Sequence, residues 1–122
     1  MDKKKILVAD DDPGIVDAMQ ILLEDQGYNV LTTMNGENVP EMCSHKPDLI
    51  FLDIWMSGVD GNVICRQLKS SDENKHIPVI MFSANRDTKD IALQCGANGF
   101  LAKPFEIKEL MRLVHEYIPN EV

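Results

Sequence analysis

Apolar runs and helical stripes alternate five times along the chain. The apolar runs lack hydrophobic and polar alternation, which is typical of strands covered on both faces by helices. They predict strands at Lys5–Asp10, Tyr28–Thr33, Asp48–Asp53, Ile77–Phe82 and Gly99–Ala102. Apolar residues at three- and four-residue steps predict helices from Pro13 to Gly27, from near Asn38 to His45, from Gly61 past Leu68, from Thr88 to Cys95 and from Glu106 to Tyr117. Since crossovers between parallel strands are usually helical and right-handed, we expect an α/β fold with a five-stranded parallel sheet between two helical layers.

The periodicity also assigns faces to single residues. Val63, Ile91 and Ile107 fall on the apolar stripes of the third, fourth and fifth predicted helices, so we expect them to face the core. Met56 lies in the predicted loop Ile54–Asp60, and we expect it to be partly exposed.

The length of 122 residues fits one domain, and no internal repeat or linker divides it, so we expect residues 1–122 to form a single domain. The three cysteines, Cys43, Cys65 and Cys95, are an odd number without CxxC spacing. This pattern favours reduced thiols over disulfides or a zinc site.

The formal net charge of −8 argues against direct binding of nucleic acid or of an anionic membrane, because both need basic patches. No apolar run approaches the length of a membrane span, and Lys3–Lys5 is followed by only four apolar residues before acids appear. The composition predicts a soluble, cytoplasmic protein without membrane association.

Polar side chains follow four of the predicted strands. Asp10 and Asp11 follow the first, Asp53 ends the third, Ser83 follows the fourth and Lys103 follows the fifth. In an open parallel sheet, ligands bind at the carboxyl ends of the strands. If the first and third strands are neighbours, three carboxylates converge there and repel each other unless a cation joins them. Oxygen ligands favour Mg²⁺, Mn²⁺ or Ca²⁺.

A phosphoryl group would explain this set of residues. Mg²⁺ held by Asp10, Asp11 or Asp53 would neutralise phosphoryl oxygens, Ser83 would donate a hydrogen bond, and Lys103 would supply a positive charge. Attack of a carboxylate on phosphorus gives an acyl phosphate, a recognised form of covalent catalysis.

Four motifs in this order and spacing resemble the receiver domain of two-component response regulators: KILVADDDPGI, LIFLDIWMSGVDG, VIMFSA and GFLAKPF. The resemblance covers nearly the whole chain. It implies a three-layer, doubly wound (βα)5 flavodoxin-like fold with strand order 2-1-3-4-5. It also implies a phosphorelay switch, not a conventional enzyme, that assists its own Mg²⁺-dependent phosphorylation and dephosphorylation.

The resemblance implies a role for each acidic residue. Asp53 matches the aspartate that accepts phosphate from a histidine of a sensor kinase or phosphotransfer protein. Asp10 and Asp11 match the acidic pair that holds Mg²⁺ or Mn²⁺; the second acid is the main ligand, and the first often acts through water. The backbone carbonyl of Trp55 would complete the protein ligands.

The resemblance also assigns the switch. Ser83 and Phe100 match the residues that move inward on phosphorylation, and Lys103 matches the family lysine, whose bond to the following proline is usually cis. Trp55 and Asn85 match positions that modulate the rate of dephosphorylation. The family commonly has proline where Ser57 stands, so the loop after Asp53 is expected to be less rigid. A downstream effector would bind the face of the fourth helix, fifth strand and fifth helix, and the chain would be a monomer or a phosphorylation-dependent dimer.

Three other functions compete with this interpretation. A Mg²⁺-dependent aspartyl phosphatase needs an acid two residues after its nucleophile, and Trp55 stands there. A flavin binder of the same fold needs a phosphate-binding loop after the first strand, where DDDPG would repel phosphate. A receiver that binds partners without being phosphorylated also stays open.

Overall fold

The computed structural model describes residues 3–56 and 58–118, and its centre is a five-stranded parallel sheet. The strands are β1 (Lys5–Ala9), β2 (Asn29–Thr33), β3 (Leu49–Asp53), β6 (Val79–Ser83) and β7 (Gly99–Ala102). Their order is β2-β1-β3-β6-β7, with every neighbouring pair parallel. Because β6 and β7 are the fourth and fifth strands of this sheet, the predicted order 2-1-3-4-5 is confirmed.

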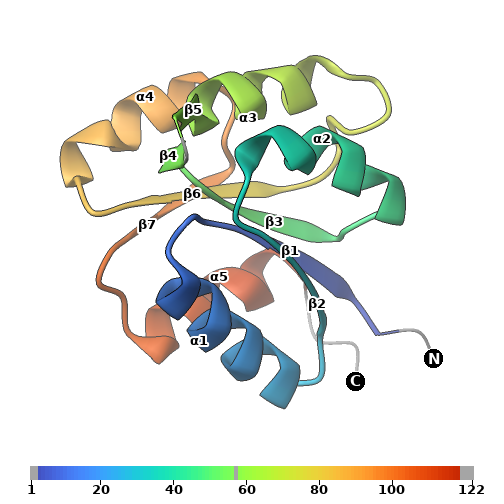
Figure 1. Cartoon of the computed structure of the whole chain (residues 1–122), viewed down its shortest axis with the longest axis vertical. Coiled ribbons are helices and arrows are strands. Elements are labelled where there is room, and N and C mark those ends of the chain that lie inside the picture. Colours follow the sequence, from blue (N-terminus) through green and yellow to red (C-terminus); the bar gives the residue numbers. More distant parts are fainter. Residues whose placement is uncertain (1–2, 57, 119–122) are drawn as a thin grey trace.

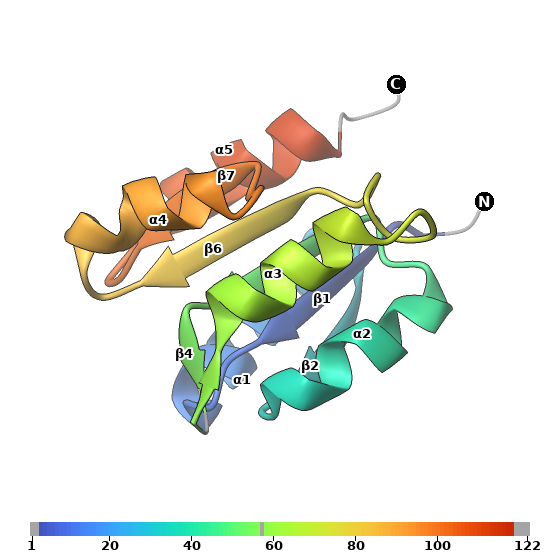
Figure 2. The ribbon, with the colours of Figure 1, turned by 90° about the horizontal axis from the view of Figure 1, so that it is seen from above.

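Helices cover both faces of the sheet (Figure 1). On one face lie α1 (Pro13–Asp25) and α5 (Ile107–Tyr117); on the other lie α2 (Val39–Met42), α3 (Gly61–Ser70) and α4 (Lys89–Gln94). Short 3-10 turns flank α2 and α4. η1 (Gly36–Asn38) precedes α2, η2 (Cys43–His45) follows it, and η3 (Arg86–Thr88) precedes α4. The three predicted layers are confirmed (Figure 1), and Figure 2, seen from above, shows α2, α3 and α4 in front of the strands.

Two apolar clusters fill the space between the layers, one on each face of the sheet. Leu7, Ile50, Leu52 and Met81 pack toward α2, α3 and α4, whereas Phe51 and Phe82 belong to the cluster beneath α1 and α5. All five residues of β3 and all five of β6 are buried. The continuous apolar runs of these strands are therefore explained by cover on both sides.

The segment between β3 and α3, for which the sequence predicts a loop, contains a small hairpin. Strands β4 (Trp55–Met56) and β5 (Val59–Asp60) pair antiparallel. Met56 is fully buried, because it packs with Ile64 and the other residues of the core under α2 and α3, so the expectation that it is partly exposed was wrong. The expectation about Ser57 lies outside the described residues.

Three helical positions expected in the core are exposed. Val63, Ile91 and Ile107 are 53%, 52% and 57% exposed. The buried faces lie one or more positions further along: Ile64, Cys65 and Leu68 in α3, Ala92 in α4, and Leu110, Leu113 and Val114 in α5. The predicted stripes also contain residues that are buried, such as Ile64, Ala92 and Leu110, so the stripes were too wide: Val63, Ile91 and Ile107 flank the buried face of each helix.

The cysteines are free and buried, as predicted: Cys43, Cys65 and Cys95. Among the described residues, none of the helices is long and apolar enough to cross a membrane.

Candidate functional site

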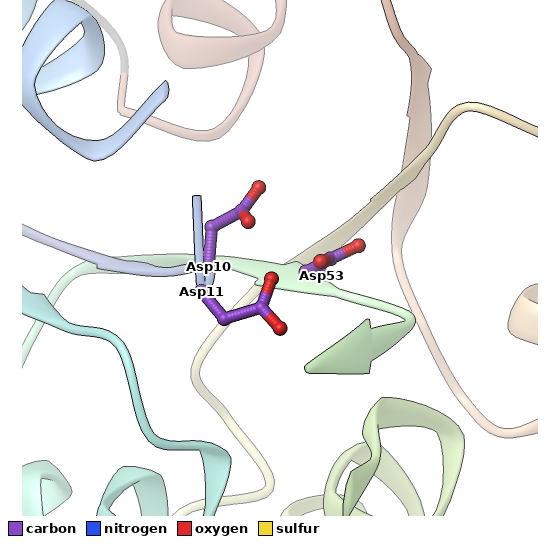
Figure 3. A group of neighbouring side chains, drawn as sticks. All are labelled: Asp10, Asp11 and Asp53. Carbon is purple, nitrogen blue, oxygen red and sulfur yellow. The ribbon is translucent and has the colours of Figure 1, made fainter. Parts of the chain in front are cut away.

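Three carboxylates meet at the carboxyl ends of β1 and β3. Asp10 follows β1 directly and Asp53 is the last residue of β3, and these two strands are neighbours in the sheet. One carboxylate oxygen from each of Asp10, Asp11 and Asp53 lies within 4.8 Å of the other two. Asp10 and Asp53 are buried, whereas Asp11 is exposed (Figure 3). The convergence expected from the strand ends is therefore present.

A lysine that follows the edge strand β7 contacts the cluster of Asp10, Asp11 and Asp53. Lys103 follows β7, and its Nζ lies 2.7 Å from Oδ2 of Asp10 and 3.4 Å from Oδ1 of Asp53. The ammonium also lies 4.7 Å from the centre of the Phe82 ring, within the range of a cation–π contact. The bond between Lys103 and Pro104 is cis, as the family resemblance implies.

Backbone hydrogen bonds hold the main chain at Lys103 and at Asp10 in place, independently of the charges of their side chains. The Lys103 amide donates to the Ser83 carbonyl at 2.8 Å, which continues the pairing of β6 with β7 past the last paired residues. The Asp10 amide donates to the Thr33 carbonyl at 3.1 Å, and Oδ1 of Asp10 accepts from the Asp12 amide at 2.9 Å. Both oxygens of Asp10 therefore have donors, one from Asp12 and one from Lys103.

The carboxyl group of Asp53 is a weaker acid than an ordinary aspartate, because its pKa is raised. Burial raises its pKa from 3.8 to about 6, with the negative charge of Asp10 as the second cause. Lys103 opposes the rise through its charge and its hydrogen bond, and Asp11 adds a smaller increase. Lys103 forms ion pairs with Asp10 and Asp53. Because three neighbouring carboxylates repel one another, a site that holds all three ionised favours further positive charge. A buried carboxyl group with so perturbed a pKa, at the carboxyl edge of the sheet, is a candidate for chemistry.

Ser83 stands at the end of β6, beside the strand that carries Asp53. It is 9% exposed, and its Oγ accepts a hydrogen bond from the Asn85 amide at 3.0 Å. The Asn85 side chain points away from that bond and caps η3 by accepting from the Asp87 amide at 2.9 Å. Ser83 and Asn85 therefore shape the turn that leads from the sheet into α4.

The remaining predicted residues lie around the acids at different depths. Trp55 stands in β4, two residues after Asp53, and is 61% exposed. Phe100, in the edge strand β7, is half-buried against the core under α3 and α4. Neither aromatic ring is fully buried.

One residue that shapes the site was not singled out from the sequence. Gly61 begins α3, and a Cβ at this position would collide with the carbonyl oxygen of Asp53 and lie 3.0 Å from that of Ile54. Its amide donates to the Ile54 carbonyl at 2.6 Å. Only glycine lets the start of α3 approach the end of β3 this closely. The glycine after Asp60 in the motif was the available signal.

Fold and site together define a class: a doubly wound α/β domain with an acidic, lysine-bridged cluster at the carboxyl edge of its parallel sheet. Comparison with known families makes this specific. The family described as "Response regulator receiver domain" matches residues 6–115. The chain belongs to this family, so it is a receiver domain of the two-component type, a signalling switch and not a classical enzyme.

Curated relatives agree with this assignment. The chain is 37% identical over 110 residues to the alkaline phosphatase synthesis transcriptional regulatory protein PhoP of Bacillus subtilis, covering 88% of this chain and 45% of PhoP. It is 32% identical over 115 residues to the DNA-binding response regulator MtrA of Mycolicibacterium smegmatis, covering 92% of this chain and 49% of MtrA. The chain spans about half the length of these relatives.

Solved structures share the architecture along the whole domain. A response regulator from Chloroflexus aurantiacus superposes with a TM-score of 0.90 at 27% identity, covering 98% of this chain and 100% of the other. The receiver domain of a sensor histidine kinase from Pseudomonas aeruginosa superposes with a TM-score of 0.88 at 26% identity, with the same coverage. That structure is described with a magnesium ion coordinated in its active-site cleft.

The donor set of this chain fits a divalent cation. Ligands on opposite sides of a Mg²⁺ are about 4.2 Å apart, twice the usual Mg–O distance of about 2.1 Å. The three carboxylate oxygens lie within 4.8 Å of one another, so small shifts or a bridging water bring them to a common ion. Hard oxygen donors and an excess of negative charge are what Mg²⁺ and Mn²⁺ select.

Proposed function

We propose that Asp53 accepts a phosphoryl group from a phosphohistidine of a sensor kinase or phosphotransfer protein, and that this modification switches the surface of the domain. The observation that carries the proposal is the convergence of Asp10, Asp11 and Asp53 on one point, with Lys103 bridging Asp10 and Asp53. In this proposal residues 1–122 act as one receiver domain.

Asp53 is suited to be the acceptor by its position at the end of the central strand β3. Strand β3 pairs with β1 as far as Leu52 and with β6 as far as Asp53, so the backbone that carries the carboxylate is held in place for an incoming phosphorus. An ionised Oδ attacks the phosphorus as the P–N bond to the imidazole breaks, and the imidazole nitrogen keeps the bonding electrons and takes up a proton. The products are an aspartyl phosphate and a neutral histidine.

Asp10 and Asp11 would hold a divalent cation beside Asp53, together with the backbone carbonyl of Trp55. The bound Mg²⁺ or Mn²⁺ would neutralise phosphoryl oxygens and relieve the repulsion among the acids. Because both oxygens of Asp10 already accept hydrogen bonds, Asp10 is suited to act through a water, whereas the exposed Asp11 faces the side from which an ion enters.

Lys103 would form a stronger ion pair with residue 53 after phosphorylation than before it. Before modification its ammonium binds Asp10 at 2.7 Å and lies 3.4 Å from Asp53. Phosphorylation adds charge and acceptor oxygens on the Asp53 side, so the lysine gains a stronger ion pair there. It therefore stabilises the modified state relative to the unmodified one.

Ser83 and Phe100 would couple phosphorylation of Asp53 to a change at the surface of the domain. The Ser83 hydroxyl now accepts from the Asn85 amide, and it becomes a donor when phosphoryl oxygens stand on the neighbouring strand. Movement of Ser83 toward them vacates space beneath η3 and α4, into which the half-buried Phe100 turns. The result is a population shift between two packings of the α4, β7 and α5 face. Trp55 and Asn85, at the rim of the site, would set how readily water removes the phosphate.

A labelling experiment tests the acceptor. Incubation with acetyl phosphate and Mg²⁺ adds one phosphate, seen as one mass increment, and Asp53→Asn takes none. The matched control is Asp12→Asn, which removes a nearby acid whose side chain only caps α1, and it stays labelled. Labelling that survives Asp53→Asn rejects the assignment of the acceptor.

A further inference from the structure

A pocket with a volume of about 680 Å³ lies where the strands of the sheet begin, at the edge opposite the acidic cluster. Its lining includes Lys4 just before β1, Pro47 just before β3, Ile77 and Pro78 just before β6, and Ile118 just after α5. Figure 2 shows the loop between α3 and β6 at the same end of the molecule as the start of β1. Pockets of roughly 300–1,000 Å³ are typical of sites for small organic molecules. We call it the amino-edge pocket.

Apolar side chains form much of this lining. Pro47, Ile77 and Ile118 are buried, and the half-buried Tyr117 lines the same pocket. The Tyr117 hydroxyl donates to the Asn98 carbonyl at 2.7 Å, which holds the ring in place. An apolar molecule that enters the amino-edge pocket therefore meets a surface already removed from water on one side, and little ordering of the protein opposes its binding.

Charged and titratable groups of both signs complete the lining: Lys4, Lys46, Asp48, Glu73 and His76. The ion pairs of 4.0 Å or less within residues 3–56 and 58–118 join Lys75 to Asp72 and Lys103 to Asp10 and Asp53. In that part of the chain, no ion pair neutralises the charges of the amino-edge pocket. The pocket thus offers cations and anions together to one ligand.

Hydrogen bonds hold the carboxylate of Asp48 in place. Its Oδ2 accepts from the Lys5 amide at 2.9 Å, and the Asp48 amide donates to the Lys5 carbonyl at 2.8 Å. A carboxylate accepts several hydrogen bonds, so Asp48 can also accept from the ammonium of a ligand. Because Asp48 is half-buried, an ion pair with it is screened less than a pair in open solvent.

Lys46 adopts a backbone conformation that is unfavourable for a lysine. Its φ of 57° places it in the left-handed region, where it ends η2, and it is the one non-glycine residue with a positive φ among those that the structure describes. Glycine and asparagine adopt this conformation at lower cost. The turn alone therefore does not explain a lysine here, whereas an anion bound in the amino-edge pocket would.

We propose that the amino-edge pocket binds a small zwitterion with an apolar body, which is the chemistry of a free apolar amino acid or of a short apolar peptide. The carboxylate of the ligand pairs with Lys4 and Lys46. Its ammonium pairs with Asp48 and Glu73. Contact of the apolar body with the lining supplies affinity, and the paired charges supply orientation and specificity.

A ligand with a charge of one sign fits the pocket less well. An acid without an ammonium would bring its negative charge near Asp48 and Glu73, and an amine without a carboxylate would bring its positive charge near Lys4 and Lys46. Like charges placed together oppose binding. The difference between a zwitterion and its singly charged analogues is therefore the quantity to measure.

Amide NMR titrations of the isotope-labelled protein test the proposal. The probes are phenylalanine and the dipeptide of two phenylalanines, with phenylpropanoate, phenylethylamine and glycine for comparison; these lack the ammonium, the carboxylate and the apolar body in turn. We expect saturable shifts of the Asp48, Ile77 and Ile118 signals, and binding at least about tenfold tighter for a zwitterion with an apolar body than for the comparison probes. The tighter of the two zwitterions identifies an amino acid or a peptide as the ligand class.

Two variants separate the charges. Asp48→Asn keeps an oxygen that accepts from the Lys5 amide, and it should weaken phenylalanine and phenylethylamine at least about fivefold but leave phenylpropanoate within about twofold. Lys46→Asn suits the left-handed backbone, and it should weaken phenylalanine and phenylpropanoate but not phenylethylamine. The matched controls are Asp17→Asn and Lys108→Gln, which change the same charges at exposed positions on α1 and α5 and should bind every probe as the wild type does.

Four results would overturn the proposal: no saturable binding of either zwitterion up to about 10 mM, equal binding of phenylalanine and its singly charged analogues, equal losses in test and control variants, or shifts caused by self-association of the protein and not by the probe. Thermal melting of each variant checks the fold, and Lys46→Asn still tests the pocket if Asp48→Asn does not fold. The buffer contains a chelator and no phosphate donor, so the outcome does not depend on phosphorylation of Asp53.

Discussion

Lys103 Nζ lies 2.7 Å from Oδ2 of Asp10, although 93 residues separate them in the chain. The two residues follow β7 and β1, and β3 and β6 lie between these strands in the sheet. The long lysine side chain thus spans the carboxyl edge of the sheet and passes over Phe82 on the way. This ion pair joins the edge strand to the acidic cluster, so Lys103 is expected to contribute to stability and, in the proposed function, to phosphorylation.

Replacing Lys103 by Gln should therefore do two things. It leaves Asp10 and Asp53 buried without their cation, which should lower the free energy of unfolding by roughly 2–4 kcal/mol in metal-free buffer. It should also slow labelling of Asp53 by acetyl phosphate at least about tenfold, because the ion pair that stabilises the phosphorylated state is gone. Urea unfolding and timed mass spectrometry measure the two effects.

Lys108→Gln is the matched control, since it removes one positive charge from an exposed position on α5. It should change neither quantity by more than experimental error. A Lys103→Gln protein that unfolds at the wild-type urea concentration in metal-free buffer would contradict the structural role assigned to the ion pair.

The raised pKa of Asp53 predicts a pH dependence of stability. The pKa of Asp53 is about 6 in the folded protein and near 3.8 in the unfolded chain. Between about pH 4 and 6 the folded protein therefore keeps a proton on Asp53 that the unfolded chain has released. The contribution of Asp53 to the free energy of unfolding therefore falls as pH rises through this window and is lowest above it. Asp53→Asn removes this penalty and should stabilise the metal-free protein by roughly 1–3 kcal/mol at pH 7.5.

The same substitution should have a much smaller effect at pH 4, where Asp53 of the wild type is protonated in the folded protein and partly protonated in the unfolded chain. Urea titrations of wild type and Asp53→Asn at pH 4, 5.5 and 7.5 in the presence of a chelator give the difference at each pH. A difference that is constant across the three pH values would show that burial and Asp10 do not raise the pKa of Asp53 as described.

Divalent metal should stabilise the folded protein through the acidic cluster. Addition of Mg²⁺ in excess of its dissociation constant is expected to raise the melting temperature of the wild type, because the ion binds the folded state alone. Asp11→Ala should lose most of this gain, while its stability without metal rises or stays unchanged because one repelling charge is removed. The matched control is Asp17→Ala, because Asp17 is an exposed acid on α1, and this variant should keep the full response to Mg²⁺. Asp12→Ala is less suitable because Asp12 caps α1.

The main features of the site were predictable because they depend on strand ends. Asp10, Asp53, Ser83 and Lys103 each follow or end an apolar run, and parallel strands bring such positions to one edge. The sheet order came from the family resemblance, since periodicity alone does not say which strands are neighbours. Ionic contacts such as that of Lys103 with Asp10 follow once the order is known.

Other features depend on tertiary contacts that a single sequence does not show. The β4–β5 hairpin has two residues in each strand, too few for any periodicity, so the burial of Met56 was missed. Ile91 and Ile107 extend the apolar stripes of α4 and α5 sideways, and only packing decides which residues of a wide stripe are covered.

Gly61→Ala should disturb the site without touching any titratable group. The added methyl would collide with the carbonyl oxygen of Asp53, which is backbone and cannot move aside without shifting the end of β3 or the start of α3. We expect a loss of roughly 1–3 kcal/mol in the free energy of unfolding. Labelling of Asp53 should slow as well, because small displacements of a reacting group reduce its rate strongly.

Gly14→Ala is the matched control for this change, since Gly14 also lies in the first turn of a helix, α1. A methyl there would meet Oδ1 of Asp12 at 3.3 Å, which a shift of about a few tenths of an ångström relieves without loss of the cap, and alanine is the better helix former. The control should keep wild-type stability and labelling. If Gly61→Ala behaves like Gly14→Ala in both measurements, the close approach of α3 to the acceptor strand does not position Asp53.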